Sequence, residues 1–430
     1  MQNIIFWFRN DLRLHDNEAF LEATKMGNVI PTYVFDERYF DKNFLGFKRT
    51  GIFRTKFLLE AVEDLRNSLR ERGSDLVIRI GRSDEIIAEM ADDLQVAAVY
   101  ASKEVTQEET TIEAQLSKRI KPLNIEIELI WTTTLFHAKD LPFQINFIPN
   151  VFTDFRKKIE QSTKIRKTFD APTQLPAIDN IEVGTIPSYK DLGFEIEPII
   201  DSRSVYQFKG GETEGLKRLD EYLWQKDLLK TYKETRNELI GSDYSSKLSA
   251  FISLGCLSPR KVYEEVKRYE AEVIANESTY WLIFELLWRD YFHFIALKVG
   301  TRMFKASGIR NDLMKQWKRN RGIFDTWVNG ETGVAFIDAN MKELKQTGFM
   351  SNRGRQNVAS YLAKELGIDW TWGAAYFESL LIDYDVCSNW CNWNYIAGVG
   401  NDPREGRMFN IDLQSSLYDP EEKYVKLWLS

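Results

Sequence analysis

The sequence contains only three cysteines and three histidines among its 430 residues. Cys256, Cys387 and Cys391 are too few for a disulfide framework, which indicates a reducing compartment and predicts a cytoplasmic protein. Cys387 and Cys391 have no histidine near them in sequence, so they do not form a zinc pattern and we expect no metal site. No histidine stands in a serine or cysteine hydrolase motif, which argues against nucleophilic or metal-assisted hydrolysis.

Glycine-rich phosphate loops and long apolar runs are also missing. No Gly-x-Gly-x-x-Gly motif and no Walker-type loop occurs, so a nucleotide site of those types is not supported. The N-terminus shows no signal or transit peptide. The longest apolar segment, Trp281–Val299, contains four charged residues, so we expect no membrane span. The net charge of −7 argues against nucleic-acid binding over the whole surface but leaves room for a local basic groove.

Aromatic residues are abundant, at 13% of the chain, and eight of the 12 tryptophans lie between Trp281 and Trp393. They culminate in a segment from Gly348 to Asp402. Its polar and aromatic residues at 389–394 fit neither a helical stripe nor a strand alternation. We therefore predict a buried aromatic turn that forms the wall of a site for a flat ligand. The alternative is a helix–loop corner with ordinary aromatic packing.

Strand and helix patterns alternate over residues 1–131. Gly27 is expected to cap the first helix at its C-terminus, and Ser83 to cap the third at its N-terminus. The alternation predicts an α/β domain with a doubly wound parallel sheet, which binds ligands beyond the carboxyl ends of its strands. The expected strands are Asn3–Phe8, Val29–Phe35, Leu76–Ile80, Ala97–Ala101 and Ile125–Trp131, and the helices Asn17–Met26, Arg49–Arg72, Ser83–Leu94 and Thr106–Ile120.

Prolines and weak periodicity mark residues 132–209 as a long connector with one short helix near 153–163, which indicates a domain boundary. Strand patterns vanish from 210 to 430, so we expect an all-helical C-terminal domain. Its predicted helices are Glu212–Trp224, Ser258-Pro259 to Glu270, Ser278 or Thr279 to Val299, Gly333–Thr347, Asn357–Leu366 and Thr371–Leu381.

A carboxylate on the apolar helix is a candidate site residue. Glu285 shares one helical face with Trp281 and Trp288. A buried carboxylate must be paired, hydrogen-bonded or neutralised, so this glutamate has either a functional or a structural partner. The structural alternative is an ion pair with Arg289, four residues later.

Two further segments have the composition of phosphate-binding sites. Asp243–Ser249 offers hydroxyls, successive backbone N–H groups and Lys247 near a helix start, as a pyrophosphate cradle does. Thr301–Ile323 is strongly basic and includes Trp317, which suits a nucleic-acid backbone. A solvated charged face is the alternative for the second segment.

Several motifs resemble those of photolyases and cryptochromes. They are Phe-Arg-Asn-Asp-Leu-Arg-Leu-His-Asp-Asn at 8–17, Leu-Ser-Pro-Arg at 257–260, Glu-Leu-Leu-Trp-Arg-Asp-Tyr at 285–291, Thr-Gly-Phe-Met-Ser-Asn-Arg at 347–353 and Ile-Asp-Tyr-Asp at 382–385. The ending Gly-Val-Gly-Asn-Asp-Pro-Arg-Glu at 398–405, with Tyr-Val-Lys-Leu-Trp-Leu near the terminus, resembles the DASH branch. The resemblance covers essentially the whole chain in order and implies the same two-domain fold.

The resemblance implies that FAD binds in a U shape in the helical domain. Arg355 and Asp383 would form a salt bridge beside the isoalloxazine, and such a fixed dipole stabilises an anionic reduced ring. Asp385 would lie on the adenosine side, and Asn389 would face flavin N5. The remaining cofactor residues implied are Tyr232, Ser245, Ser246, Lys247, Leu248, Ser249, Trp281, Arg289 and Asn352.

The same resemblance implies light-driven repair of cyclobutane pyrimidine dimers in DNA. Electrons would hop through Trp393, Trp370 and Trp317, although three packed core tryptophans are the alternative. A flipped dimer would bind where Glu285 meets its base edge and Trp288 stacks on it. The implied lesion pocket is Glu285, Trp288, Asn352, Arg353, Gln356 and Tyr395.

Tyr395 replaces a tryptophan of relatives that repair duplexes, which predicts weaker support for base flipping and a preference for single-stranded DNA. Glu104 matches a residue that contacts folate in relatives, so a methenyltetrahydrofolate antenna is a further expectation. We expect a monomeric photolyase. The alternatives are a blue-light receptor that binds FAD and nucleic acid without repair, and a flavoprotein of other redox purpose. The short ending after the terminal motif favours the enzyme, and no nicotinamide motif supports the last alternative.

Overall fold

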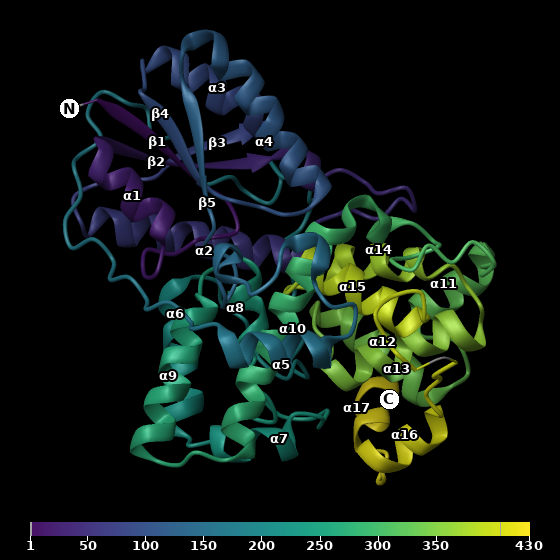
Figure 1. The fold of residues 1–430 in the computed structure, drawn as a ribbon. Coiled ribbons are helices and arrows are strands. Elements are labelled where there is room, and N and C mark those ends of the chain that lie inside the picture. The colour runs from purple at the N-terminus through teal and green to yellow at the C-terminus, as the bar shows by residue number, and fades with distance from the viewer. Residues whose placement is uncertain (1, 405) are drawn as a thin grey trace.

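The computed structural model describes residues 2–404 and 406–430, which form an N-terminal α/β part and a C-terminal helical part packed side by side (Figure 1). The sheet has five parallel strands in the order β3-β2-β1-β4-β5. The order reverses between β1 and β4, so the doubly wound sheet is confirmed. The strands are β1 (Asn3–Phe8), β2 (Asn28–Asp36), β3 (Val77–Gly81), β4 (Ala98–Ser102) and β5 (Glu126–Ile130).

Helices cover both faces of this sheet. Helices α3 (Ser83–Asp93) and α4 (Gln107–Ile120) pack on one face with their own apolar cluster. Helices α1 (Glu18–Met26) and α2 (Ile52–Arg70) pack on the other, where the core continues into the helical part. Because both faces are covered, β1 and β2 read as continuous apolar runs rather than alternations.

Two predicted helix caps differ from the structure. Arg82, not Ser83, occupies the N-cap position of α3, because the Ser83 backbone N–H (3.0 Å) and hydroxyl donate to the buried Asp36 carboxylate. Gly27 follows α1 in an extended conformation with φ 175°, not in a left-handed cap. A Cβ at Gly27 would lie 2.2 Å from the Gln2 carbonyl oxygen, so close approach to β1 is what requires glycine there.

The helical part follows a connector whose helix, α5 (Phe152–Ser162), lies against α10. Helix α10 begins at Glu277 with Asn276 as its cap in a capping box, so neither Ser278 nor Thr279 opens it. Ser258 caps α9 as predicted. The helices are α6 (Glu212–Asp220), α7 (Tyr232–Thr235), α8 (Ser249–Ser253), α9 (Pro259–Glu272), α10 (Glu277–Val299), α11 (Arg321–Asn329), α12 (Ala335–Thr347), α13 (Asn352–Ser360), α14 (Trp370–Leu380), α15 (Val386–Ala397), α16 (Ile411–Tyr418) and α17 (Lys423–Leu429).

The turn predicted at 389–394 is wrong, because these residues belong to helix α15. Asp385 caps it by accepting a hydrogen bond from the Ser388 backbone N–H at 2.7 Å. Two asparagines on it bond carbonyls one turn earlier: Asn392 donates to Ser388 and Asn394 to Trp390, each at 2.8 Å. Much of this helix is buried, so no single apolar stripe appears in the sequence.

The two parts meet where the loop after β1 contacts the end of α8. The Leu12 backbone N–H donates to the Leu254 carbonyl at 3.1 Å, and the Arg13 guanidinium to the Gly255 carbonyl at 2.9 Å. Buried Glu212 accepts the backbone N–H groups of Leu14 and His15 at 2.7 and 3.0 Å. Among the described residues, no helix has the length and apolar character to cross a membrane.

Replacing Gly255 should weaken this contact. Gly255 has φ +66°, and a Cβ there would lie 2.1 Å from the Asn10 carbonyl oxygen. Gly255→Ala should therefore lower the free energy of unfolding by about 1–3 kcal/mol beyond the left-handed backbone cost of about 1–2 kcal/mol. Denaturant unfolding measures this.

Gly241→Ala is the matched control, because Gly241 has φ +95° with nothing within 4 Å of the added Cβ. It should show the backbone cost alone. Equal losses in the two variants would contradict a tight contact at Gly255.

Candidate functional site

The interdomain cavity, of about 590 Å³, lies at the carboxyl ends of β1, β2 and β4. Arg9, Asp36 and Glu104 line it from the sheet side, and His293 and Trp390 from the helical side. This is the place where the strand order reverses and where such sheets bind ligands.

Glu104 is a buried acid in the wall of the interdomain cavity. Asn10 donates to its carboxylate at 3.1 Å. Burial raises the pKa of Glu104 to about 7, against the lowering effect of the Arg9 guanidinium. Glu113 pairs with Arg9 at 2.6 Å and accepts the Glu104 backbone N–H at 3.0 Å, which holds the Glu104 main chain in place.

Two smaller cavities adjoin each other inside the helical part. The deep cavity, of about 260 Å³, is bordered by α7, α10 and α13, and the narrow cavity, of about 100 Å³, by α13 and α15. Of the residues predicted for the cofactor, the lesion or the electron relay, these cavities bring together Tyr232, Ser245, Ser246, Lys247, Leu248, Ser249, Glu285, Arg289, Asn352, Arg355, Gln356, Asp383, Asp385, Asn389 and Trp393. Trp281, Trp288, Arg353, Tyr395, Trp370 and Trp317 lie outside both linings.

The predicted cradle is organised by a residue that the sequence reasoning missed. The buried Arg218 guanidinium donates to the carbonyls of Ser242, Ser245 and Ser246 at 3.0, 3.4 and 3.0 Å. It therefore fixes the loop through its carbonyl groups. Lys247 follows with φ +59°, a left-handed conformation that is costly for a lysine and is held by the surrounding fold.

Lys247 is almost fully buried, and within the described part of the chain its ammonium has one hydrogen bond, to the Ser245 hydroxyl at 3.1 Å. Burial lowers its pKa well below the usual value, opposed by Glu343, whose own pKa burial raises to about 7. Tyr424 on α17 donates to Glu343 at 2.5 Å. A phosphate group at the cradle would supply the acceptors that the Lys247 ammonium lacks.

The predicted ion pair of the cofactor site is present. Arg355 Nη2 lies 2.9 Å from Asp383 Oδ2, while Asp383 Oδ1 is buried with no hydrogen-bond partner among the described residues. Asn389 is buried and donates to the Ala374 carbonyl at 3.0 Å, which leaves its carbonyl oxygen free to accept. The unpaired Asp383 oxygen, the dipole of the Arg355–Asp383 pair and the buried Lys247 ammonium would together suit a cofactor that carries N–H donors and phosphates.

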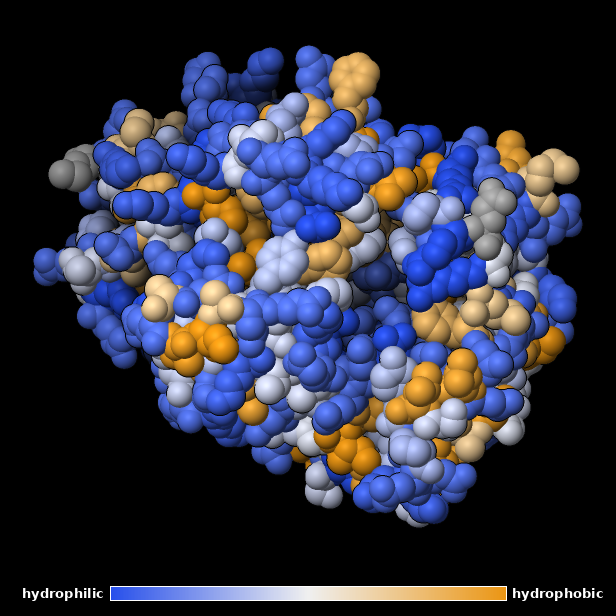
Figure 2. Space-filling model, turned by 60° about the horizontal axis from the view of Figure 1, so that its bottom comes forward, coloured by the Kyte–Doolittle hydropathy of each residue, from blue (hydrophilic) through white to orange (hydrophobic). Residues whose placement is uncertain are grey.

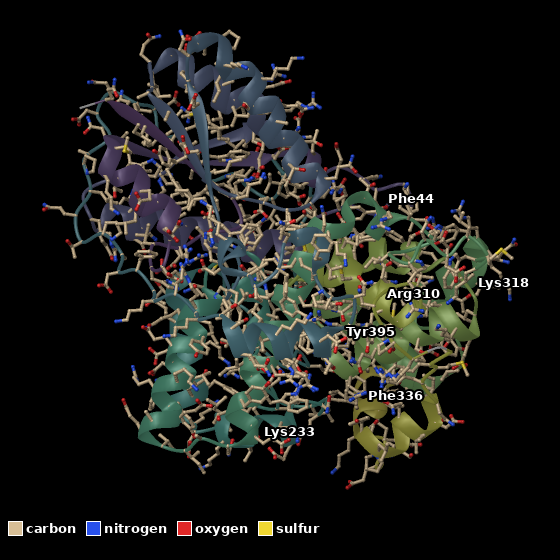
Figure 3. The ribbon with its side chains drawn as sticks, in the orientation of Figure 1. Phe44, Lys233, Arg310, Lys318, Phe336 and Tyr395 are labelled. Atoms are coloured by element: carbon tan, nitrogen blue, oxygen red, sulfur yellow. The ribbon has the colours of Figure 1, made fainter. Side chains whose placement is uncertain are left out.

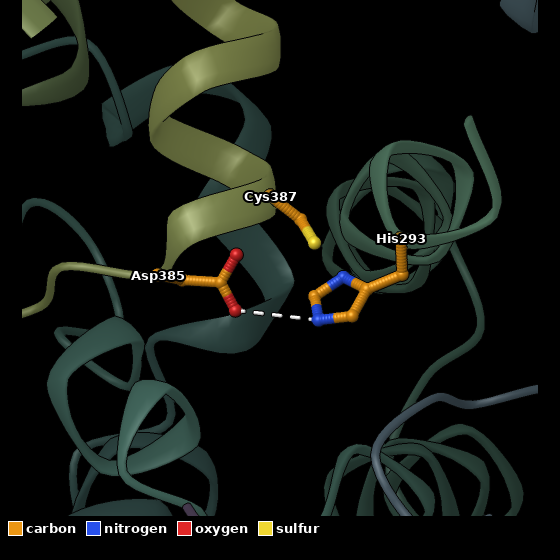
Figure 4. Close-up of side chains that lie close together, drawn as sticks. All are labelled: His293, Asp385 and Cys387. Atoms are coloured by element: carbon orange, nitrogen blue, oxygen red, sulfur yellow. Dashed lines mark ion pairs between the residues drawn. The ribbon is translucent and has the colours of Figure 1, made fainter. Parts of the chain in front are cut away.

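Asp385, His293 and Cys387 place their polar atoms within 4.8 Å of one another (Figure 4). Cys387 has no histidine near it in sequence, and the fold brings His293 there from α10. His293 Nδ1 donates to the Arg289 carbonyl at 3.0 Å, so Nε2, 3.4 Å from Asp385, carries the lone pair. Burial lowers the pKa of His293 to about 4. The Arg289 guanidinium lies 3.3 Å from the same carboxylate and supplies the balancing charge.

Glu285 pairs with Arg236 at 2.7 Å, so the alternative pair with Arg289 is wrong. The Trp281 indole N–H donates to Glu285 at 3.2 Å. The Glu285 side chain is partly exposed and lines the deep cavity. Burial raises the pKa of its carboxyl group, and the Arg236 guanidinium opposes that rise. Arg236 comes from the segment after α7, far away in sequence, and no local pattern identifies it.

Trp288 stacks on Phe152 of α5, with centroids 3.7 Å apart, and meets Tyr395 edge-on at 5.8 Å. One face of Trp288 is therefore taken by the connector helix. Arg353 donates to Gln356 at 3.0 Å and lies over the Tyr418 ring of α16. Figure 2 shows a hollow on the face that carries α7 and α16, with hydrophilic side chains inside it and hydrophobic ones along part of its rim.

The three predicted relay tryptophans do not form one continuous stack. Trp317 and Trp370 donate their indole N–H groups to the same acceptor, the Ala306 carbonyl, at 2.9 and 3.0 Å. Trp393 packs instead against Phe377 at 5.1 Å and Trp327 at 6.2 Å. The two outer tryptophans are therefore neighbours, and Trp393 belongs to the wall of the narrow cavity.

Several cations of the basic segment 301–323 have structural partners. Arg310, which lies between Tyr395 and Lys318 in Figure 3, donates to the carbonyls of Gly400 and Asp402. Arg319 pairs with buried Asp369 at 3.0 Å. These cations tie down neighbouring loops, so the segment is more than a solvated face.

Models of two protein families match this chain, one in each of its two parts. Residues 4–177 match the DNA photolyase family model, and residues 281–430 match the FAD binding domain of DNA photolyase. A cryptochrome DASH of Gloeobacter violaceus is 54% identical over 429 residues, which is 100% of this chain and 85% of that protein.

Solved structures agree. A cryptochrome from Synechocystis sp. superposes with a TM-score of 0.96 at 49% identity, over 99% of this chain and 88% of that one. A class III photolyase from Agrobacterium tumefaciens superposes with a TM-score of 0.86 at 27% identity, over 100% of this chain and 86% of that one. The helical part is accordingly an FAD-binding domain, and the chain belongs to the photolyase/cryptochrome family.

Proposed function

We propose that the protein is a light-driven DNA photolyase that splits cyclobutane pyrimidine dimers, mainly in single-stranded DNA. The observation that carries the proposal is the Glu285 carboxylate, held at the deep cavity by Arg236 and the Trp281 indole. Reduced FAD held in the helical part would supply, under blue light, one electron to the dimer and would take it back once the two ring bonds are broken. No net oxidation results.

The residues of the chain would bind and orient both partners. The cradle around Lys247 would hold the FAD phosphates, and the Arg355–Asp383 pair would lie beside the flavin ring. Glu285 would accept a hydrogen bond from the base edge of a flipped dimer. Trp288, with one face on Phe152, would present the other to the lesion. Relay residues Trp393, Trp370 and Trp317 would keep the flavin reduced.

We propose, further, that the interdomain cavity holds a folate antenna at Glu104. The cavity has a doubly wound sheet on one side and aromatic side chains such as Trp390 on the other, which suits a flat ligand. An antenna in this cavity would lie beside a flavin in the deep cavity, because Asp385 and Arg289 line both cavities.

Repair should depend on the strandedness of the substrate. Reduced, FAD-loaded protein under blue light should remove a thymine dimer from a single-stranded oligonucleotide faster than from its duplex, because the duplex must be unstacked first. Tyr395→Trp should raise duplex repair by enlarging the stacking surface beside Trp288.

Dark samples and Tyr263→Trp, on the remote helix α9, serve as controls. Equal repair of both substrates by the wild-type protein would contradict the strand preference. Bound, photoreducible flavin with no repair of either substrate would favour the receptor alternative.

Glu285→Gln should reduce dimer repair roughly tenfold, because the interaction of the charged acceptor with the base edge is lost. FAD content should stay unchanged. The measurement is repaired dimer per absorbed photon. Glu265→Gln is the matched control, since Glu265 also accepts an indole N–H, from Trp224 at 3.2 Å, and pairs with Lys261 at 2.9 Å. Equal effects of the two substitutions would refute a role in repair.

Folate affinity should fall as pH drops through about 7, the pKa of Glu104, because the protonated acid accepts fewer hydrogen bonds than the carboxylate. Glu104→Gln should bind folate more weakly and without that pH dependence. Methenyltetrahydrofolate titrations followed by absorbance measure both, with Glu126→Gln on β5 as control. The antenna proposal would be refuted if protein supplemented with folate released no folate on acid extraction.

A further inference from the structure

We propose that Trp390 is a fourth electron-relay residue and forms a second route from the flavin site to Trp370. This inference rests on the proposed function, because it extends the relay of tryptophans. The family motifs imply no role for Trp390, which the sequence shows only as one of the aromatic residues between Gly348 and Asp402.

The first observation is the contact between the two indoles. The Trp390 and Trp370 rings meet edge to face, with centroids 5.9 Å apart and planes at 75°. Trp370 is fully buried and Trp390 is 7% exposed. Rings this close transfer electrons more readily than rings separated by another side chain, because electronic coupling falls steeply with distance.

The second observation is the position of Trp390 between cavities. Its indole N–H donates to the Tyr384 hydroxyl at 3.2 Å. Tyr384 lines both the narrow cavity and the interdomain cavity, and Trp390 lines the interdomain cavity. The pair therefore spans the distance from the wall of the flavin-binding cavities to Trp370.

The chemistry makes Trp390 the electron carrier and Tyr384 the bridge. A tyrosine that loses an electron must also release its proton, and burial raises the pKa of Tyr384 well above its usual value. Oxidised Trp390 keeps its N–H on the Tyr384 oxygen, whose lone pair stabilises the positive charge. Tyr384 thus shapes the environment of Trp390 without being oxidised.

Trp393, the expected first carrier, has different neighbours. The rings nearest to it among the described residues are Phe377 at 5.1 Å and Trp327 at 6.2 Å, while Trp370 meets Trp390. Trp390 lies three residues before Trp393 on α15, so both rings project from one side of that helix. The Trp390 ring contact therefore offers a route to Trp370 beside the one expected through Trp393.

The electrons balance along this route. Photoexcited oxidised flavin takes one electron from Trp390, Trp370 returns one to Trp390, and Trp317 returns one to Trp370. A thiol reductant in solution restores Trp317. Each indole loses and regains one electron, and no indole bond is broken.

The test compares Trp390→Phe, Trp393→Phe and the double variant in protein containing oxidised FAD. Flavin photoreduction in the presence of dithiothreitol and the transient absorption of indole radicals are the readouts. Each single variant should keep part of the photoreduction, and the double variant should lose nearly all of it along with the indole radical signal.

Trp224→Phe, which removes a remote indole beside α9, is the matched control and should behave as the wild type. Flavin content and near-ultraviolet circular dichroism show that each variant is folded; for a variant that is not, Trp390→Tyr replaces Trp390→Phe. The inference is overturned if loss of the Trp390 indole leaves photoreduction unchanged in both the wild-type and the Trp393→Phe background.

Trp370→Phe separates this failure from failure of the proposed function. Loss of photoreduction in Trp370→Phe with no effect of Trp390→Phe rejects Trp390 alone. Unchanged photoreduction in Trp370→Phe rejects the whole relay and Trp390 with it. Dimer repair by protein reduced chemically with dithionite does not need the relay, so it tests the photolyase proposal independently.

Discussion

The carboxylate of Asp385 joins helices α15 and α10 at a point that borders all three cavities. It caps α15 through the Ser388 backbone N–H at 2.7 Å and lies 3.3 Å from Arg289 of α10. Burial alone would raise its pKa, yet the Arg289 guanidinium and the Ser388 backbone N–H hold the pKa of Asp385 below its usual range. Because Asp385 lines all three cavities, its charge and position shape the wall that the cavities share.

Around that wall the protein buries charges that folding alone does not favour. Lys247 has a strained backbone and one hydroxyl acceptor, and Asp383 keeps an unpaired oxygen. Buried, incompletely paired groups destabilise a fold by amounts of order 1–3 kcal/mol each. A cofactor that completes these hydrogen bonds stabilises the folded state by mass action, so cofactor binding and stability are coupled.

Sequence reasoning succeeded where local patterns decide. Alternating strands and helices identified the doubly wound sheet, and most of the residues implied by the family motifs line the cavities. It failed at residues 389–394, because a helix with much of its surface buried, such as α15, shows no amphipathic stripe. The structural alternative, a pair of Glu285 with Arg289 by the i,i+4 rule, was also wrong, because Arg236 reaches Glu285 from a distant segment.

The sequence by itself therefore determined the fold class, the flavin-binding domain and the residue types available for chemistry, since periodicity and motifs are local properties. Tertiary structure decided which of those residues meet. His293 beside Cys387, Arg218 on the cradle carbonyls, Phe152 on Trp288 and Trp390 against Trp370 all join segments far apart in the chain or on different helices. Such contacts depend on how helices pack, and helix packing is fixed by the shape of the whole core rather than by any local pattern.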